Sequence, residues 1–144
     1  MVSPETGAPQ RSSPAVRLRR GWFAAGLALV AAVIVLSLVP LPEPPVEHGD
    51  KAEHLATYAF LMLWFAQLGA GGQRGVAAAG ALIALGVGIE FLQDLTPYRK
   101  MDPVDMVANA VGVALGWLAA PPRTPNVLDR LVRRVAGRDS TIEF

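Results

Sequence analysis

The stretch from Gly21 to Val39 contains no charged residue, and this feature most constrains what the chain can fold into. A helix needs about 20 predominantly apolar residues to cross the hydrocarbon core of a bilayer. A helix of a soluble bundle should instead show one polar face, and neither this stretch nor Gly75–Ile89 shows one. Charged residues make up only 17% of the chain, against about 25% in soluble domains. We therefore predict an all-α integral membrane protein.

Three further stretches of similar length are mostly apolar, and each ends at residues that interrupt a helix. Prolines follow the first, third and fourth stretches, and a proline cannot continue a helix interior. A Gly-Gly-Gln-Arg segment separates the second stretch from the third. The sequence therefore predicts a four-helix membrane bundle with spans at about residues 21–39, 52–69, 75–93 and 103–120.

The first span resembles a secretory signal peptide in one respect, since a basic segment precedes it. Its apolar run is longer than the ~7–15 residues of a signal-peptide core, and no A-x-A-like cleavage site follows it. We therefore expect this helix to be retained in the membrane.

Basic residues are distributed unevenly between the segments that flank the spans. The two ends of the chain and the loop between the second and third spans carry Arg11, Arg17, Arg19, Arg20, Arg74, Arg123, Arg130, Arg133, Arg134 and Arg138. The other loops carry only Lys51, Arg99 and Lys100. Because segments rich in lysine and arginine stay in the cytoplasm, we expect both termini to be cytoplasmic. Residues 1–20 and 121–144 would then be basic tails flanking a membrane domain at 21–120, in the cell membrane.

The C-terminal tail has an amphipathic pattern of its own. One helical face would hold the apolar residues Val127, Leu128, Leu131, Val132 and Val135, and the arginines lie mostly opposite. Such a helix can lie on the anionic inner leaflet of a membrane. We predict a short amphipathic C-terminal helix; the alternative is a frayed tail whose arginines only set the orientation.

The polar residues of the membrane domain gather at the outer ends of the second, third and fourth spans. Asp50, His54 and Tyr58 are spaced i, i+4 and i+8, and Asp105 and Asn109 are spaced i and i+4, so each set shares a helix face. The whole group is Asp50, Lys51, His54, Tyr58, Glu90, Gln93, Arg99, Asp102, Asp105 and Asn109. We predict that these residues meet in one pocket.

Some of these residues have a structural explanation. Asp50 begins a capping-box-like D-K-A-E segment, and Asp102 precedes a proline as a helix N-cap would. Gly112 and Gly116 form a G-x-x-x-G pattern that close helix packing explains. Tyr58 could equally be an aromatic anchor at the membrane interface.

Ionisable residues near membrane depth are costly and usually functional, and His54, Glu90 and Arg99 are of this kind. Glu90 lies about one turn inside its predicted helix with no positive neighbour on its own face. It therefore needs a partner from another segment, which His54, Lys51 or Arg99 could supply. A purely structural ion network is the alternative.

The polar residues fall into four boxes whose order and spacing resemble the VanZ-like membrane proteins. The boxes are D-K-x-x-H-x-x-x-Y at 50–58, G-x-x-I-E-x-x-Q at 86–93, P-x-R at 97–99 and D-x-x-x-N-x-x-G-x-x-x-G at 105–116. The resemblance covers roughly residues 50 to 118. It implies a bacterial cell-envelope protein of the inner membrane, from a family linked through its prototype to glycopeptide resistance and proposed to act on lipid head groups.

The mixture of residue types then suggests chemistry on a phosphate-linked head group at the outer leaflet. The catalytic residues would be His54, whose unperturbed pKa lies nearest to working pH, with Glu90 and Asp105 orienting its imidazole. Membrane lipid or a lipid-linked cell-wall precursor would be bound by Lys51, Tyr58, Gln93, Arg99 and Asn109. A non-catalytic binder of such a precursor or of a glycopeptide, and a structural membrane bundle, are the alternatives, so the question of catalysis stays open.

A metal site built from His54, Glu90, Asp50 and Asp105 is a weaker alternative. One histidine among carboxylates is a poor signature, and the neighbouring lysine and arginine would repel a cation. We expect no metal and no other cofactor. The absence of cysteine excludes thiolate sites, and a net charge of +1 gives no field that would recruit nucleic acid.

Overall fold

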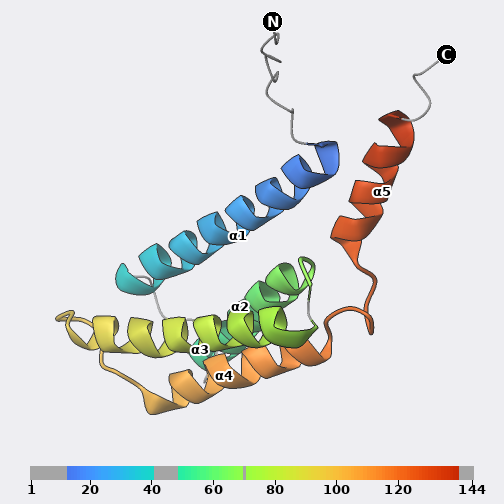
Figure 1. The fold of residues 1–144 in the computed structure, drawn as a ribbon. Coiled ribbons are helices and arrows are strands. Elements are labelled where there is room, and N and C mark those ends of the chain that lie inside the picture. Colours follow the sequence, from blue (N-terminus) through green and yellow to red (C-terminus); the bar gives the residue numbers. More distant parts are fainter. Residues whose placement is uncertain (1–12, 41–48, 70, 140–144) are drawn as a thin grey trace, which may run out of the picture.

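In the computed structural model the described residues are 13–40, 49–69 and 71–139 (Figure 1). They form five helices and no strand. In chain order these are α1 (Pro14–Leu38), α2 (Gly49–Ala66), α3 (Gly72–Asp94), α4 (Pro103–Leu118) and α5 (Val127–Asp139). The predicted all-α fold is confirmed.

Local residues explain where several of these helices begin. Ser13 caps α1 by accepting a hydrogen bond from the backbone N–H of Val16, and a proline occupies the first turn. Asp102 caps α4 in the same way, as the sequence predicted, by accepting from the N–H of Val104. Between α2 and α3 the chain turns at Gly69 and Gly72, whose φ angles of 134° and 63° favour glycine.

Helices α2 and α4 form the most extensive helix pair, and two glycines on α4 allow their close approach. A Cβ atom placed on Gly112 would lie 2.4 Å from the backbone oxygen of Leu55, and one on Gly116 would lie 2.4 Å from that of Ala59. The predicted close packing at these glycines is confirmed. Helix α3 packs against this pair, and the buried apolar core lies between the three helices, at Tyr58, Leu61, Met62, Ala66, Ala79, Leu82 and Val113.

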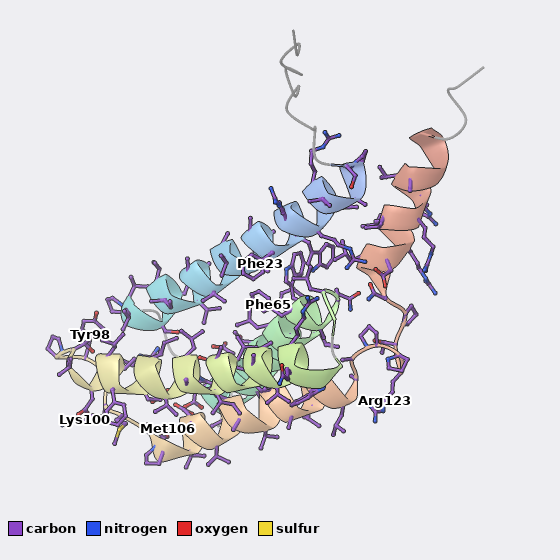
Figure 2. All side chains as sticks on the ribbon, viewed as in Figure 1. Phe23, Phe65, Tyr98, Lys100, Met106 and Arg123 are labelled. Carbon is purple, nitrogen blue, oxygen red and sulfur yellow. The ribbon has the colours of Figure 1, made fainter. Side chains whose placement is uncertain are left out.

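Helix α1 lies across α2 and α3 and is attached to them at both ends (Figure 1). Near its start, Trp22 stacks on Trp64 of α2 with ring centroids 4.2 Å apart, and each indole N–H donates to the backbone oxygen of the other residue. Figure 2 shows Phe23 and Phe65 on the facing sides of the same two helices. Near its end, Gln93 of α3 donates to the backbone oxygen of Ser37.

The predicted C-terminal helix is present as α5, and it packs against the beginning of α1. Leu128, from the predicted apolar face, is fully buried, and Asp129 pairs with Arg19 of α1. The start of α5 is held as well, because the side-chain oxygen of Gln67 accepts from the backbone N–H of Val127. Part of the amphipathic face therefore contacts protein, while Val127 and two further apolar residues, Leu131 and Val135, stay partly exposed.

Among the described residues, α1 and α3 are the two helices long and apolar enough to cross a membrane. Helix α4 is apolar but shorter, with 16 residues, and α2 has charged residues in its first turn. Large apolar side chains are exposed on the outer faces of these helices, among them Val35, Leu36, Phe60, Phe91, Leu92, Val107 and Leu118.

Candidate functional site

Lys51, in the first turn of α2, connects three carboxylates at one end of the helices. Its ammonium group lies 2.7 Å from Asp50 Oδ2, 2.8 Å from Asp102 Oδ2 and 3.0 Å from Asp105 Oδ1. These four residues, the Lys51 cluster, link the starts of α2 and α4. The sequence predicted Asp50 as a helix cap, but the helix already includes Gly49, and Asp50 lies in its first turn with its carboxylate paired to Lys51.

The contacts of the Lys51 cluster shift the pKa values of its members. Hydrogen bonding to Lys51 lowers the pKa of Asp50 and of Asp102 below the ordinary 3.8. Hydrogen bonding, first to Asp102 and then to Asp50, raises the pKa of Lys51 above the ordinary 10.5. All three groups therefore favour their charged forms in the folded protein.

The Lys51 cluster predicts a pH-dependent contribution to stability. Because the carboxyl pKa values are lowered on folding, their contribution is present above pH 3.8 and is lost as the pH falls further. Because the pKa of Lys51 is raised, its contribution is present below pH 10.5 and is lost only in stronger alkali. We expect a Lys51→Met variant to melt below wild type between these two values, and the gap to close in acid. Melting temperatures measured against pH give the comparison.

The control is Lys100→Met, since Lys100 is exposed and has no hydrogen bond or ion pair with a described residue. Its melting temperature should follow wild type at every pH. A gap for Lys51→Met that persists unchanged below pH 3 would contradict the role given to this cluster.

His54, one turn further along α2, contacts α4 through both sides of its ring. Nδ1 lies 3.0 Å from Asn109 Oδ1, and Nε2 lies 3.7 Å from Asp105 Oδ2. An amide oxygen can only accept, so Nδ1 carries the proton in this contact. In the neutral ring the lone pair is then on Nε2, facing a carboxylate. The predicted face of α4 that carries Asp105 and Asn109 thus contacts the face of α2 that carries His54.

Glu90 of α3 is deeply buried, with only 1% of its surface exposed. Its Oε2 accepts from the backbone N–H of Asp102, at 3.2 Å, and its Oε1 has no hydrogen-bond partner among the described residues. The hydroxyl of Tyr58 and the side-chain nitrogen of Asn109 are buried and unpartnered in the same sense. Buried polar atoms without a partner are uncommon, and a water molecule, an ion or a bound group is the usual explanation.

Gly86, one turn before Glu90, makes room for this arrangement. A Cβ atom there would lie 2.9 Å from Asn109 Nδ2 and 3.2 Å from Tyr58 Cζ. A larger residue would therefore push the two polar side chains away from α3. In the sequence, only its place in the second box distinguishes this glycine.

The residues that could hold a metal ion are His54, Glu90 and Asp105. One ligand atom from each lies within 4.8 Å of the other two, and two of the three residues, Glu90 and Asp105, are buried. Each comes from a different helix, so the site exists only when α2, α3 and α4 are packed together.

Two predicted pocket residues have other surroundings. Gln93 is buried, but its side-chain amide donates to the backbone oxygen of Ser37 on α1. It has no hydrogen bond with the described residues around His54. Arg99 lies in the loop between α3 and α4 and makes no hydrogen bond or ion pair with any described residue. Asp102 caps α4, as predicted, and makes two further contacts. Its carboxylate accepts from Lys51, and its backbone N–H donates to Glu90.

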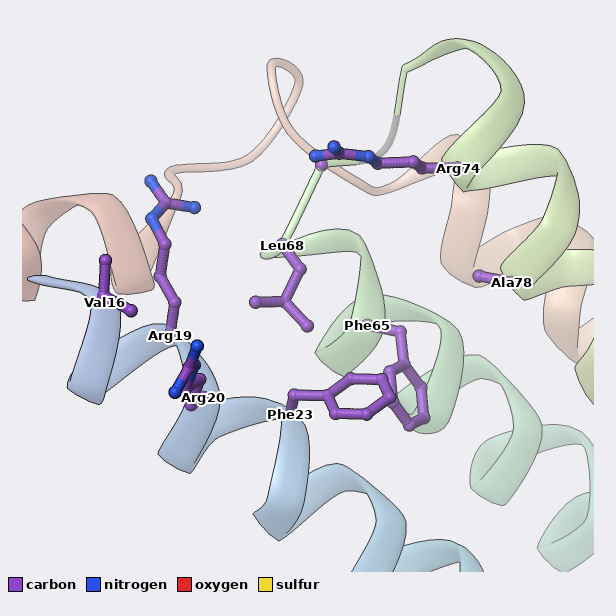
Figure 3. Close-up of a pocket in the computed structure, with 9 residues that line it drawn as sticks. Val16, Arg19, Arg20, Phe23, Phe65, Leu68, Arg74 and Ala78 are labelled. Atoms are coloured by element: carbon purple, nitrogen blue, oxygen red, sulfur yellow. The ribbon is translucent and has the colours of Figure 1, made fainter. Parts of the chain in front are cut away.

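A groove of about 510 Å³ lies at the opposite end of α2 and α3 (Figure 3). Its apolar wall is formed by Phe23, Phe65 and Leu68. Three arginines also line it: Arg19, Arg20 and Arg74. In the sequence, these arginines only indicated the orientation of the chain in the membrane.

No family model, no curated protein and no solved structure matches this chain.

Proposed function

We propose that this chain is a VanZ-like multi-pass membrane protein whose helices α1 to α4 cross the bilayer. Two of them have the length and apolarity that this requires. The exposed apolar side chains on their outer faces support the proposal, because large apolar patches on a protein surface mark contact with lipid or a partner. With the arginine-rich ends in the cytoplasm, the Lys51 cluster faces the outer leaflet and the arginine-flanked groove the inner one.

The function we propose is hydrolysis or transfer of a phosphate-linked head group of a membrane lipid or lipid-linked precursor. The observation that supports it is the grouping of His54, which is partly exposed, with the buried Glu90 and Asp105 at one end of the helices. A head group could reach this end while its acyl chains stay among the apolar helix surfaces. Lys51 is engaged by three carboxylates, so contact with the phosphate falls mainly to Arg99, whose guanidinium has the planar geometry for it.

In hydrolysis, a water molecule would attack phosphorus while the bond from phosphorus to the leaving oxygen breaks. His54 Nε2 would take the proton of the water and return it to the leaving oxygen. Asn109 holds the ring in the required tautomer, through the 3.0 Å contact to Nδ1. Asp105, beside Nε2, would stabilise the imidazolium that forms.

A non-catalytic binder is the second candidate, and the unpartnered atoms favour it. Tyr58 and Asn109 offer donors and Glu90 an acceptor within one buried neighbourhood, which is enough to bind a head group without reaction. Such a binder would keep its ligand when His54 is replaced.

The two candidates are separated by measuring head-group turnover in proteoliposomes made with bacterial phospholipids and lipid-linked precursors. We expect His54→Ala to lower turnover by about 10²- to 10⁴-fold, the usual contribution of a general base. The matched control is Glu53→Gln, which changes an exposed carboxylate on the same helix and should leave turnover at the wild-type level. Full turnover in a folded His54→Ala protein would rule out the catalytic proposal.

A further inference from the structure

The polar site around Lys51 and His54 has more acidic than basic side chains. Four carboxyl groups gather there, and among the described residues Lys51 is the only lysine or arginine in contact with any of them. His54 lies 3.7 Å from Asp105 and adds a positive charge only when it is protonated. Lys51 contacts Asp50, Asp102 and Asp105, which leaves Glu90 without a cation. A buried carboxylate is costly unless it is paired or coordinates a metal. Binding of a further cation is one way to balance this carboxylate, and taking up a proton is the other.

We propose that His54, Glu90 and Asp105 bind a divalent transition-metal ion. One ligand atom from each lies within 4.8 Å of the other two. Ligands about 2.1 Å from an ion in tetrahedral geometry are about 3.4 Å apart, so small side-chain rotations would close the site. The Oε1 atom of Glu90 is buried and has no hydrogen-bond partner among the described residues, so it is available as a ligand.

The surroundings of His54 match those of a metal ligand. A ligating histidine donates its other ring N–H to an oxygen that fixes its orientation, and Nδ1 of His54 has this contact with Asn109 at 3.0 Å. The remaining nitrogen, Nε2, faces Asp105 Oδ2. One imidazole with two carboxylates favours Zn²⁺ or Mn²⁺ over Ca²⁺ and Mg²⁺, which prefer oxygen ligands alone.

From the sequence we expected Lys51 and Arg99 to repel a metal ion. The contacts in the structure weaken this expectation for both residues. Lys51 contacts Oδ1 of Asp105, whereas His54 faces Oδ2. Asp105 would thus separate the lysine from the ion. Arg99 has no ion pair or hydrogen bond with any of the three ligands, all of which lie in the described part of the chain.

This inference stands without the proposed reaction, since a metal can bind whether or not a lipid is turned over. If both hold, three protein ligands leave a position open for water, as in catalytic zinc sites. The ion would lower the pKa of that water, and His54 would then serve as a ligand instead of as the base.

The test uses the full chain in detergent, stripped with a chelator and titrated with Zn²⁺ and Mn²⁺ by calorimetry. We expect one ion per chain, and at least a 100-fold loss of affinity in His54→Ala and in Glu90→Gln. Glu53→Gln and Asp94→Asn, which alter exposed carboxylates on α2 and α3, should bind as wild type does. Absence of binding, or unchanged affinity in His54→Ala, would overturn the proposal.

A variant that gains a signal guards against loss through misfolding. The chain has no cysteine, so His54→Cys introduces its only thiol. Loaded with Co²⁺, this variant should show a thiolate-to-metal charge-transfer band that wild type lacks. A folded His54→Cys protein that binds Co²⁺ without this band would also overturn the proposal. Neither measurement uses turnover, so failure of the metal site and failure of the proposed reaction are seen separately.

Discussion

Replacing Gly112 or Gly116 with alanine is expected to destabilise the protein by about 1–3 kcal/mol each, the usual cost of overpacking. A Cβ atom at either position would lie 2.4 Å from a backbone oxygen of α2. Backbone atoms cannot rotate away as a side chain can, so α2 and α4 would have to separate. That movement would also pull Lys51 from Asp105 and His54 from Asn109, because these contacts join the same two helices.

The measurement is reversible unfolding in mixed detergent, followed by circular dichroism. Gly80→Ala and Gly88→Ala are the matched controls, since a Cβ atom on either of these α3 glycines meets nothing within 4 Å. They should be neutral or stabilising by up to about 1 kcal/mol, because alanine is the better helix former. Gly112→Ala protein as stable as Gly88→Ala protein would contradict the observed packing of α2 on α4.

Replacing Trp64 with alanine is expected to lower the free energy of unfolding by about 2–3 kcal/mol. Loss of a fully buried tryptophan costs about 3–5 kcal/mol, and the cost is smaller here because this ring is half-buried. The change removes the stacking on Trp22 and the hydrogen bond from the Trp64 indole to the backbone oxygen of Trp22. The backbone acceptor for the Trp22 indole remains, but the ring that positions this indole is lost. Since this pair fixes the start of α1, backbone amides of α1 should exchange hydrogen faster in the variant. Hydrogen exchange read by mass spectrometry measures this directly.

A double-mutant cycle tests whether the two tryptophans act as a pair. Trp22→Ala, Trp64→Ala and the double variant should show a coupling free energy of about 0.5–1.5 kcal/mol for the aromatic contact. Phe91→Ala, which removes an exposed ring of α3, serves as the control and should leave exchange in α1 unchanged. Strictly additive losses would show that α1 is held by other contacts.

The sequence located the helices well where apolarity and helical structure coincide. Helix α4 begins at Pro103, the predicted start of the fourth span, because a cap and a proline define that end locally. Helix α1 instead begins at Pro14, well before the predicted span at Gly21. Apolarity marks only the part of a helix suited to the membrane interior, and the arginine-rich turns before it are also helical.

Spacing along one helix identified faces of the candidate site but could not identify partners. The i, i+4 pattern correctly placed His54 on one face of α2 and Asn109 on one face of α4, and the structure joins them. Gln93 follows Glu90 by about one turn, yet its side chain reaches α1. Which neighbour a helix face meets depends on the packing of the other helices, which no local pattern contains.

The sequence by itself determined the helical class, the apolar surfaces and the gathering of polar residues at one end of the helices. These follow from composition and periodicity, which act within a segment. Only the tertiary structure decided which charges compensate one another. Lys51 forms ion pairs with three carboxylates, whereas Glu90 accepts a hydrogen bond from a backbone N–H and contacts no lysine or arginine among the described residues. The reason is physical, since electrostatic contacts depend on distances between side chains from different helices. For the contacts between α2 and α4, those distances depend on the glycines that let the two helices approach closely.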